Sequence, residues 1–183
     1  MRTILFLSFL IISISVFAQE KYITRTGHIS FFSEAPMENI EAHNHQVTSI
    51  LNVTSGDMVF SMLMKGFEFE KALMQEHFNE SYVESEKFPK STFKGVIQDF
   101  DAIDLSKNGE YDVVVKGQLE IHGESKEYSI KGKLTRDGNK IQGKSKFNVK
   151  VADHGIKIPA GKVNNIAEVV EVTVDISYEP YGK

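Results

Sequence analysis

The chain of 183 residues contains no cysteine. This absence excludes disulfide bonds, thiolate metal sites, a thiol nucleophile and a lipid-anchored cysteine at an N-terminal cleavage site. If the chain is exported, its fold must therefore be held by its own hydrophobic core. A single domain of about 165 residues can achieve this, because folding at that size buries roughly two thirds of the surface of the unfolded chain.

The chain also lacks an excess of basic residues. It carries 21 lysines and arginines against 25 aspartates and glutamates, and without the first 18 residues the basic residues number 20. Nucleic-acid binding needs a clustered basic face. Lys144, Lys146 and Lys150 share one face of an expected strand, but lysines on an exposed strand commonly give solubility and protect the sheet edge. The composition therefore predicts no nucleic-acid partner.

Only one long apolar run is present, and it lies at the start of the chain. Arg2 precedes the apolar segment 4–16, and the segment ends at Ala18 in the small-residue pattern that a signal peptidase accepts. The run is too short to cross a bilayer comfortably, so we interpret residues 1–18 as a signal peptide cleaved before Gln19, with an uncleaved anchor as the less favoured alternative. We expect residues 19–183 to be a single periplasmic or secreted domain without an integral membrane segment.

The strongest pattern runs from residue 111 to residue 151, where apolar and polar side chains alternate in three successive segments separated by tight turns. Alternation with a period of two predicts antiparallel strands with one buried face. Gly117, Gly132 and Gly143 fall on the inward rows, where a packed core would carry larger side chains. A glycine inside a strand marks sharp curvature or the close approach of another group. The three positions therefore predict either a barrel corner or a hollow interior.

Alternating segments outside this region complete the set of strands. The strand from Met58 to Met64 is apolar on both faces, which predicts cover on its outer side as well. Residues 37–44, in contrast, are expected to form a loop. Eight antiparallel strands favour closure into a barrel, since closure removes the exposed edges, and such a barrel is either filled by side chains or holds one small ligand. The additional strands are expected at residues 22–33, 47–53, 92–100 and 170–178.

The spacing of apolar residues changes between residues 67 and 82. Apolar residues recur there at intervals of three and four, among them Phe69, Leu73, Met74 and Phe78. This spacing predicts a short amphipathic helix, which either caps one barrel end or covers the doubly apolar strand.

Several short motifs resemble those of the YceI-like family, a group of exported lipocalin-like barrels associated with polyisoprenoid binding. No single motif is specific, but their order and spacing together are. The resemblance implies an all-β fold, an eight-stranded antiparallel lipocalin-like barrel with one short helix, that encloses a long apolar tail. The motifs are His77-Phe78, Tyr82, Glu86-Lys87-Phe88-Pro89, Phe93-Lys94, Leu119-Glu120-Ile121-His122-Gly123 with Lys126, and Asp153-His154-Gly155-Ile156.

Few residues suggest catalysis or metal binding. His43 and His45 would share one side of an extended segment, which is half of a metal site. No clear third ligand is adjacent, so we interpret them as part of a solvated loop and predict no metal. His122 is expected to make a hydrogen bond in a turn. We predict no catalytic residue and no cofactor.

The leading hypothesis is an exported, non-enzymatic carrier that holds the apolar tail of an isoprenoid or fatty-acyl lipid inside the barrel. One alternative is an enzyme acting on such a lipid, for which Ser49 and Ser145 are the obvious inward polar groups. Another is a filled barrel that serves as a structural or interaction module, and a homodimer is left open. The predicted ligand-binding residues are Phe60, Met62, Met64, Phe93, Tyr111, Val113, Val115, Gly117, Tyr128, Ile130, Gly132, Gly143, Phe147, Val172 and Val174.

Overall fold

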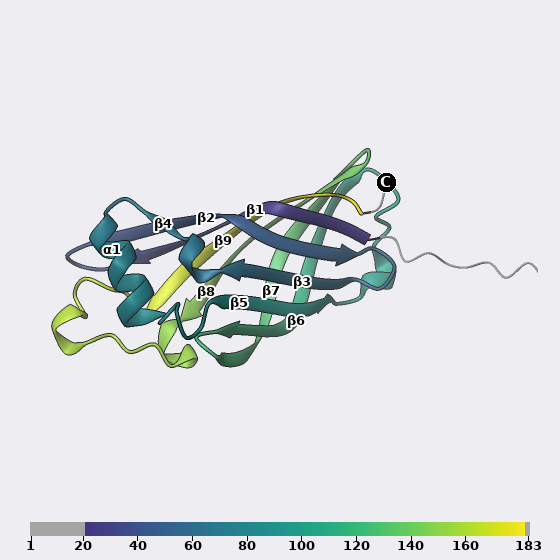
Figure 1. Cartoon of the computed structure of the whole chain (residues 1–183). Helices are drawn as coiled ribbons and strands as arrows, with labels where there is room; N and C mark the ends of the chain where they lie inside the picture. Colours follow the sequence, from purple (N-terminus) through teal and green to yellow (C-terminus); the bar gives the residue numbers. More distant parts are fainter. Residues whose placement is uncertain (1–20, 182–183) are drawn as a thin grey trace, which may run out of the picture.

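Most of residues 21–181, the part of the chain that the computed structural model describes, lies in antiparallel β-strands (Figure 1). The proposed signal peptide, residues 1–18, lies outside the described residues. The described elements are β1 (Lys21–Glu34), β2 (Asn39–Asn52), β3 (Asp57–Leu63), β4 (Glu68–Phe69), α1 (Ala72–His77), β5 (Lys90–Ile97), β6 (Gly109–Ile121), β7 (Glu124–Asp137), β8 (Lys140–Lys150) and β9 (Val169–Pro180).

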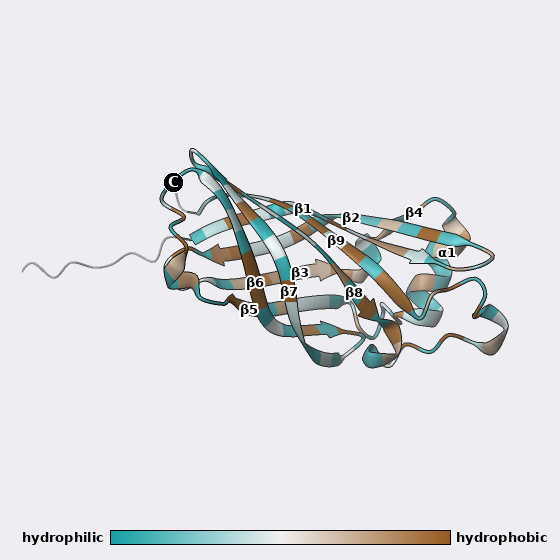
Figure 2. Ribbon diagram, turned by 180° about the vertical axis from the view of Figure 1, so that it is seen from behind, coloured by the Kyte–Doolittle hydropathy of each residue, from teal (hydrophilic) through white to brown (hydrophobic). Residues whose placement is uncertain are grey.

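The strands form one sheet that closes on itself. Their order is β1-β9-β8-β7-β6-β5-β3-β2-β4, and pairing of β1 with β2 joins the two sides of the sheet. Strand β4 has only two residues and extends the sheet beside β2, so the barrel wall has eight strands. The predicted eight-stranded antiparallel barrel with one short helix is confirmed. Figure 2 shows the alternation of apolar and polar residues along the strands that makes closure favourable.

The prediction of a loop over residues 37–44 is wrong. Strand β2 begins at Asn39, and Ala42 and Asn44 pair with Phe31 and Ile29 of β1. The inward row was hard to recognise because it contains a small residue and a polar one, both fully buried. The Asn44 side chain is satisfied there, since its Nδ2 donates to the backbone oxygen of Leu63 at 2.9 Å.

The helix is shorter than its sequence pattern predicts. Helix α1 covers only Ala72–His77, and a π-helical turn continues it to Tyr82. Phe69 belongs to β4 instead, because it pairs with Ala42 of β2. Tertiary pairing has therefore overridden the helical spacing at the start of this segment.

Of the two positions considered for the helix, the structure has the one at the barrel end. Figure 1 shows α1 at the same end as the β1–β2 hairpin and the segment 155–168, whereas β1 starts and β9 ends at the opposite end. The outer face of β3 is not covered by described residues, since Val59 and Leu63 are 40% and 46% exposed. The predicted cover on this face is wrong. Among residues 21–181, no helix has the length and apolar character needed to span a membrane.

The end of the barrel opposite α1 is filled by side chains. A buried hydrogen bond of 2.7 Å joins the hydroxyls of Ser49 and Tyr178 within this core. Burial raises the pKa of the Tyr178 phenol, which keeps it protonated at neutral pH. The fully buried apolar residues of this end are Tyr22, Val47, Leu51, Ile141, Ile176 and Tyr178.

Candidate functional site

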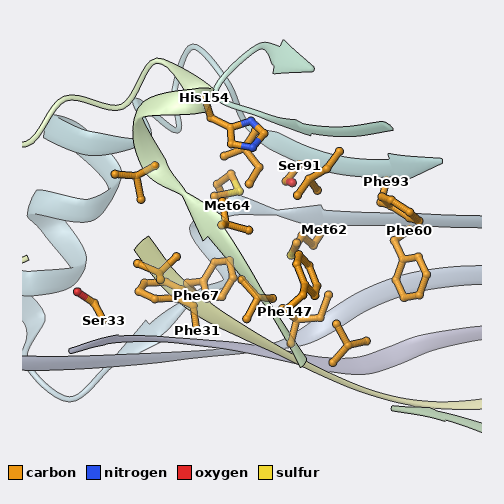
Figure 3. A pocket seen from close by; sticks show the side chains of 18 of the residues that line it. Phe31, Ser33, Phe60, Met62, Met64, Phe67, Ser91, Phe93, Phe147 and His154 are labelled. Atoms are coloured by element: carbon orange, nitrogen blue, oxygen red, sulfur yellow. The ribbon is translucent and has the colours of Figure 1, made fainter. Parts of the chain in front are cut away.

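An apolar cavity of about 290 Å³ lies inside the barrel, between α1 and the filled end. Figure 3 shows the side chains of Phe31 and Phe67 on the side nearer the helix, with Phe60 and Phe93 farther along the barrel. The volume is at the lower end of the range for small-ligand pockets. The cavity is therefore large enough for a single slender apolar group rather than a bulky ligand.

The inward row of β9 shows where the cavity begins and ends. Val170, Val172 and Val174 line the cavity and are only half-buried, whereas Ile176 and Tyr178 at its floor are fully buried. Side chains on one strand face thus change from lining a space to filling it within ten residues. The hollow part is the half of the barrel nearer α1.

Four phenylalanines gather in this half of the barrel. The Phe78 ring lies 5.0 Å from Phe69 and 5.6 Å from both Phe31 and Phe67, measured between ring centroids. All four line the cavity, and they come from β1, β4, the turn before β4 and the π-helical turn after α1. The contacts of Phe78 are stacked with Phe31, edge-to-face with Phe67 and tilted with Phe69, and such aromatic pairs are stabilising beyond the area they bury.

Polar contacts tie three segments together at this end. The Glu38 carboxylate lies 3.1 Å from the Lys71 ammonium and accepts a hydrogen bond from the Asn165 amide at 3.5 Å. The hydrogen bond from Lys71 lowers the pKa of Glu38. Glu38, Asn165 and the exposed Lys162 all line the cavity, so its α1 end has a polar rim that reaches solvent.

A buried histidine supplies a polar edge in the cavity wall. His154 is fully buried, and its Nδ1 lies 2.9 Å from the Glu124 backbone oxygen while its Nε2 lies 3.1 Å from the Tyr128 hydroxyl. A carbonyl oxygen only accepts, so Nδ1 carries the proton and a neutral ring accepts from Tyr128 at Nε2. Figure 3 shows the His154 ring among the cavity side chains.

Next to this histidine, His122 connects the β6–β7 turn to the segment after α1. Its Nδ1 lies 3.1 Å from the His154 backbone oxygen, and its Nε2 lies 2.7 Å from the Glu84 carboxylate. The hydrogen bond from His122 lowers the pKa of Glu84. Both Glu84 and His122 have left-handed backbone conformations, with φ of 43° and 54°. His122 makes hydrogen bonds from the β6–β7 turn, but both partners lie in other segments rather than in the turn, so these bonds fix one side of the cavity wall.

Most of the residues predicted to bind a ligand border this cavity, although contact with a ligand stays a prediction. The structure brings twelve of the fifteen together around one space. These are Phe60, Met62, Met64, Phe93, Val113, Val115, Ile130, Gly132, Gly143, Phe147, Val172 and Val174.

The other three residues lie elsewhere. The Tyr111 hydroxyl donates to the backbone oxygens of Asp104 and Lys107 in the loop before β6. Tyr128 does not line the cavity, and its hydroxyl contacts His154, which does. A Cβ on Gly117 would lie 2.3 Å from the Lys94 backbone oxygen, so this glycine allows β5 and β6 to approach closely. At Gly117 the close approach of β5, and not a hollow interior, therefore accounts for the glycine.

Gly132 borders the cavity, but it is also a point of close approach. A Cβ there would lie 2.9 Å from the Lys144 backbone oxygen of β8. The backbone of the neighbouring strand thus opposes a larger residue at Gly132, although this position also borders the cavity.

Sequence reasoning missed the phenylalanines at the α1 end of the lining. Phe31 falls in the expected strand over residues 22–33, and Phe67, Phe69 and Phe78 fall in the segment 67–82 with helical spacing, so none of them is among the predicted ligand-binding residues. The alternation of Phe67 and Phe69, which has the period of a strand, was the available signal. It could be read correctly only with the knowledge that this segment pairs with β2.

The two inward serines have structural partners. Ser49 is buried against Tyr178, and the Ser145 hydroxyl donates to the Lys131 backbone oxygen at 2.6 Å. Neither hydroxyl has a histidine or carboxylate partner among its hydrogen bonds, so neither is arranged as an activated nucleophile.

Solved structures with the same fold are found by comparison. A polyisoprenoid binding domain from Saccharophagus degradans, implicated in plant cell wall breakdown, is 14% identical, with a TM-score of 0.75 over 87% of this chain and 97% of that one. BcnA of Burkholderia cenocepacia is 13% identical, with a TM-score of 0.68 over 82% and 95% of the two chains. A YCEI protein of Campylobacter jejuni is 12% identical, with a TM-score of 0.61 over 79% and 86%.

None of the curated proteins compared with this chain matches it. A family model described as the YceI-like domain, in contrast, matches residues 21–178, which include all nine described strands except the last two residues of β9. The chain therefore belongs to the YceI-like domain family.

Proposed function

We propose that the mature chain is an exported, non-catalytic binding protein that holds the apolar tail of an amphiphilic isoprenoid or fatty-acyl lipid in the barrel cavity. The observation that carries this proposal is the hollow half of the barrel, an apolar cavity with a polar rim at α1 and a floor of fully buried side chains. An apolar tail fits the lining, while a polar headgroup remains at the rim.

The lining provides a sufficient driving force for such a ligand. Burying one methylene group is worth roughly 0.8 kcal/mol. Each methylene group that the cavity encloses contributes this amount, and the free energy of ordering the ligand is subtracted from the sum. Within a cavity of about 290 Å³, we propose that one tail is bound and that a longer tail extends past the rim.

Family membership supports the same class of ligand. The S. degradans domain of the same fold is a polyisoprenoid binding domain. At 14% identity the shared feature is the barrel itself, so the proposal for this chain depends on its own cavity lining.

Native mass spectrometry of the purified protein tests the proposal. We expect a mass above that of the polypeptide, which organic extraction removes and incubation with a polyprenyl or fatty-acyl lipid restores. A bare polypeptide that takes up neither kind of lipid would contradict it. Intact mass after production with residues 1–18 present tests the proposed cleavage before Gln19.

A pair of variants in β3 tests where the lipid lies. Met62 lines the cavity, whereas the neighbouring Leu63 is on the outer face and 46% exposed. Met62→Trp should reduce lipid uptake at least tenfold by occupying the cavity, and Leu63→Trp should leave uptake unchanged. Equal uptake by two folded variants would place the lipid outside the cavity. This pair is preferable to substitution of Gly132, where the β8 backbone opposes any side chain.

A further inference from the structure

Three histidines meet on the outer surface of the barrel, away from the cavity. His28 is on β1, and His43 and His45 are on β2, so the pairing of these strands brings residues from two parts of the sequence together. The ring centroids of His28 and His45 are 4.4 Å apart with nearly parallel planes, and those of His28 and His43 are 5.3 Å apart. None of the three lines the cavity. Strand β1 thus brings a third imidazole, which the sequence did not reveal, next to His43 and His45.

Two of the ring nitrogens already lie at a distance suited to a shared ion. His28 Nε2 is 3.1 Å from His43 Nδ1. Two nitrogens bound at about 2.1 Å to one tetrahedral ion lie roughly 3.4 Å apart, so a metal needs the two nitrogens to move slightly apart and both rings to turn until their lone pairs point at the ion. A metal ion would replace the single proton that these two nitrogens share.

A carboxylate orients one of these ligands. Glu41 Oε1 lies 3.5 Å from His43 Nε2, the ring nitrogen that does not face His28. Metal-binding histidines commonly donate their second N–H to a carboxylate, which fixes the ring and increases its basicity. In His43, Nδ1 faces His28 and Nε2 faces the Glu41 carboxylate, which is the same order of groups.

There is room for the third histidine to join the other two. His43 and His45 line a surface hollow of about 530 Å³, together with Glu41, Glu68 and Glu70. Alternate residues of a strand share one face, so His43 and His45 project from the same side of β2. Within residues 21–181 no three ligating side chains already surround one point, so His45 must turn from its stack on His28 to complete the site.

The charges around the cluster favour a cation. The carboxylates of Asp175 and Glu41 lie close enough to His28 to interact with it electrostatically. Asp175 is also paired with Lys144 at 3.2 Å.

We propose that His28, His43 and His45 bind one divalent transition-metal ion on the outer face of β1 and β2, with water or a carboxylate of the adjacent hollow as the remaining ligand. Imidazole ligands suit zinc and copper, and the site is open and three-coordinate from the protein. The site is separate from the cavity, so it does not depend on the proposed lipid ligand.

Titration calorimetry of the tag-free protein with ZnCl₂ tests this proposal. We expect one ion per chain, with affinity reduced at least tenfold by His28→Gln or His43→Gln. Glu41→Gln should weaken binding by about tenfold, the usual effect of removing an orienting carboxylate. His77→Gln, which alters an exposed histidine of α1 outside the cluster, is the matched control and should bind like the parent.

Two results would overturn the proposal. One is the absence of zinc binding by the parent protein, and the other is equal binding by the folded His28→Gln and His43→Gln variants. As a second measurement, imidazole ¹⁵N chemical shifts should change on zinc addition at the three cluster histidines, whereas changes confined to His122 or His154 would also contradict it. Lipid retention should be the same in the cluster variants and the parent, so failure here is distinguishable from failure of the proposed lipid binding.

Discussion

The two halves of the barrel are built from the same strands but differ in how their inward side chains pack. On β9, Val172 and Val174 leave space beside them, whereas Ile176 and Tyr178 are fully buried. On β8, Phe147 is half-buried beside the cavity and Ile141 is fully buried at the other end. The filled half therefore supplies close packing, and the hollow half gives up some of that packing and leaves an apolar cavity.

Polar groups differ between the halves in the same way. In the filled half, Ser49 and Tyr178 satisfy each other away from water. In the hollow half, Glu38 and Lys71 make an ion pair at the solvent-facing rim. A buried pair contributes to stability mainly by avoiding an unsatisfied group, whereas a rim pair mainly fixes the position of segments. The difference can be tested by perturbing one half at a time.

Lipid binding should give the largest effect and should act through the hollow half. At a free lipid concentration of one hundred times the dissociation constant, the free energy of unfolding should rise by about 2.7 kcal/mol. Denaturant unfolding with and without lipid measures this increment. The increment should persist in Val47→Ala, which alters the filled half, and disappear in Met62→Trp. Loss of the increment in Val47→Ala would show that the two halves are not separable.

A matched pair of valines compares packing in the two halves directly. Val47 is fully buried and does not line the cavity, whereas Val174 is half-buried and does. Val47→Ala should lower the free energy of unfolding by about 2 kcal/mol, from two lost methyl groups and the void they leave. Val174→Ala should lower it by less than about 1 kcal/mol, since its methyl groups already border a space. Equal losses in the lipid-free protein would contradict the packing difference.

The buried hydroxyl pair should give an intermediate effect. Tyr178→Phe leaves the Ser49 hydroxyl without its partner and should cost about 1–3 kcal/mol in chemical denaturation. The double variant Ser49→Ala with Tyr178→Phe should regain most of that loss, because no polar group is then left unpaired. A double variant as unstable as the sum of the single ones would mean that the two hydroxyls act independently.

The smallest effect is expected at the exposed contact between Glu84 and His122. Because His122 lowers the pKa of Glu84, the stabilisation is present above the unfolded-state pKa of about 4.3 and is lost as pH falls through the lower folded-state value. Thermal unfolding of the parent and of Glu84→Gln should therefore differ slightly near pH 6, with the parent more stable, and converge below pH about 4. A difference that stays constant down to acid pH would contradict this assignment. The effect is small because the Glu84 side chain is 45% exposed.

Much of the barrel and most of its inward rows could be predicted from local patterns. Alternation from residue 111 to residue 151 specified β6, β7 and β8, and alternation in these and the other strands placed twelve of fifteen chosen residues around one cavity. The errors in the strand assignment occurred where the type or spacing of a residue did not indicate its place in the sheet. Asn44 is polar yet fully buried, and Phe69 has helical spacing yet pairs in a strand.

Local alternation was enough to predict most of the strands and which of their faces is dry, because a period of two is a property of each segment. The half of that dry interior that is hollow depends instead on how side chains from all eight strands meet across the barrel, which no segment shows alone. The tertiary structure also decided that His28 joins His43 and His45, because strand pairing brings together residues about fifteen positions apart. Packing and pairing are properties of the closed barrel, and no single segment carries them.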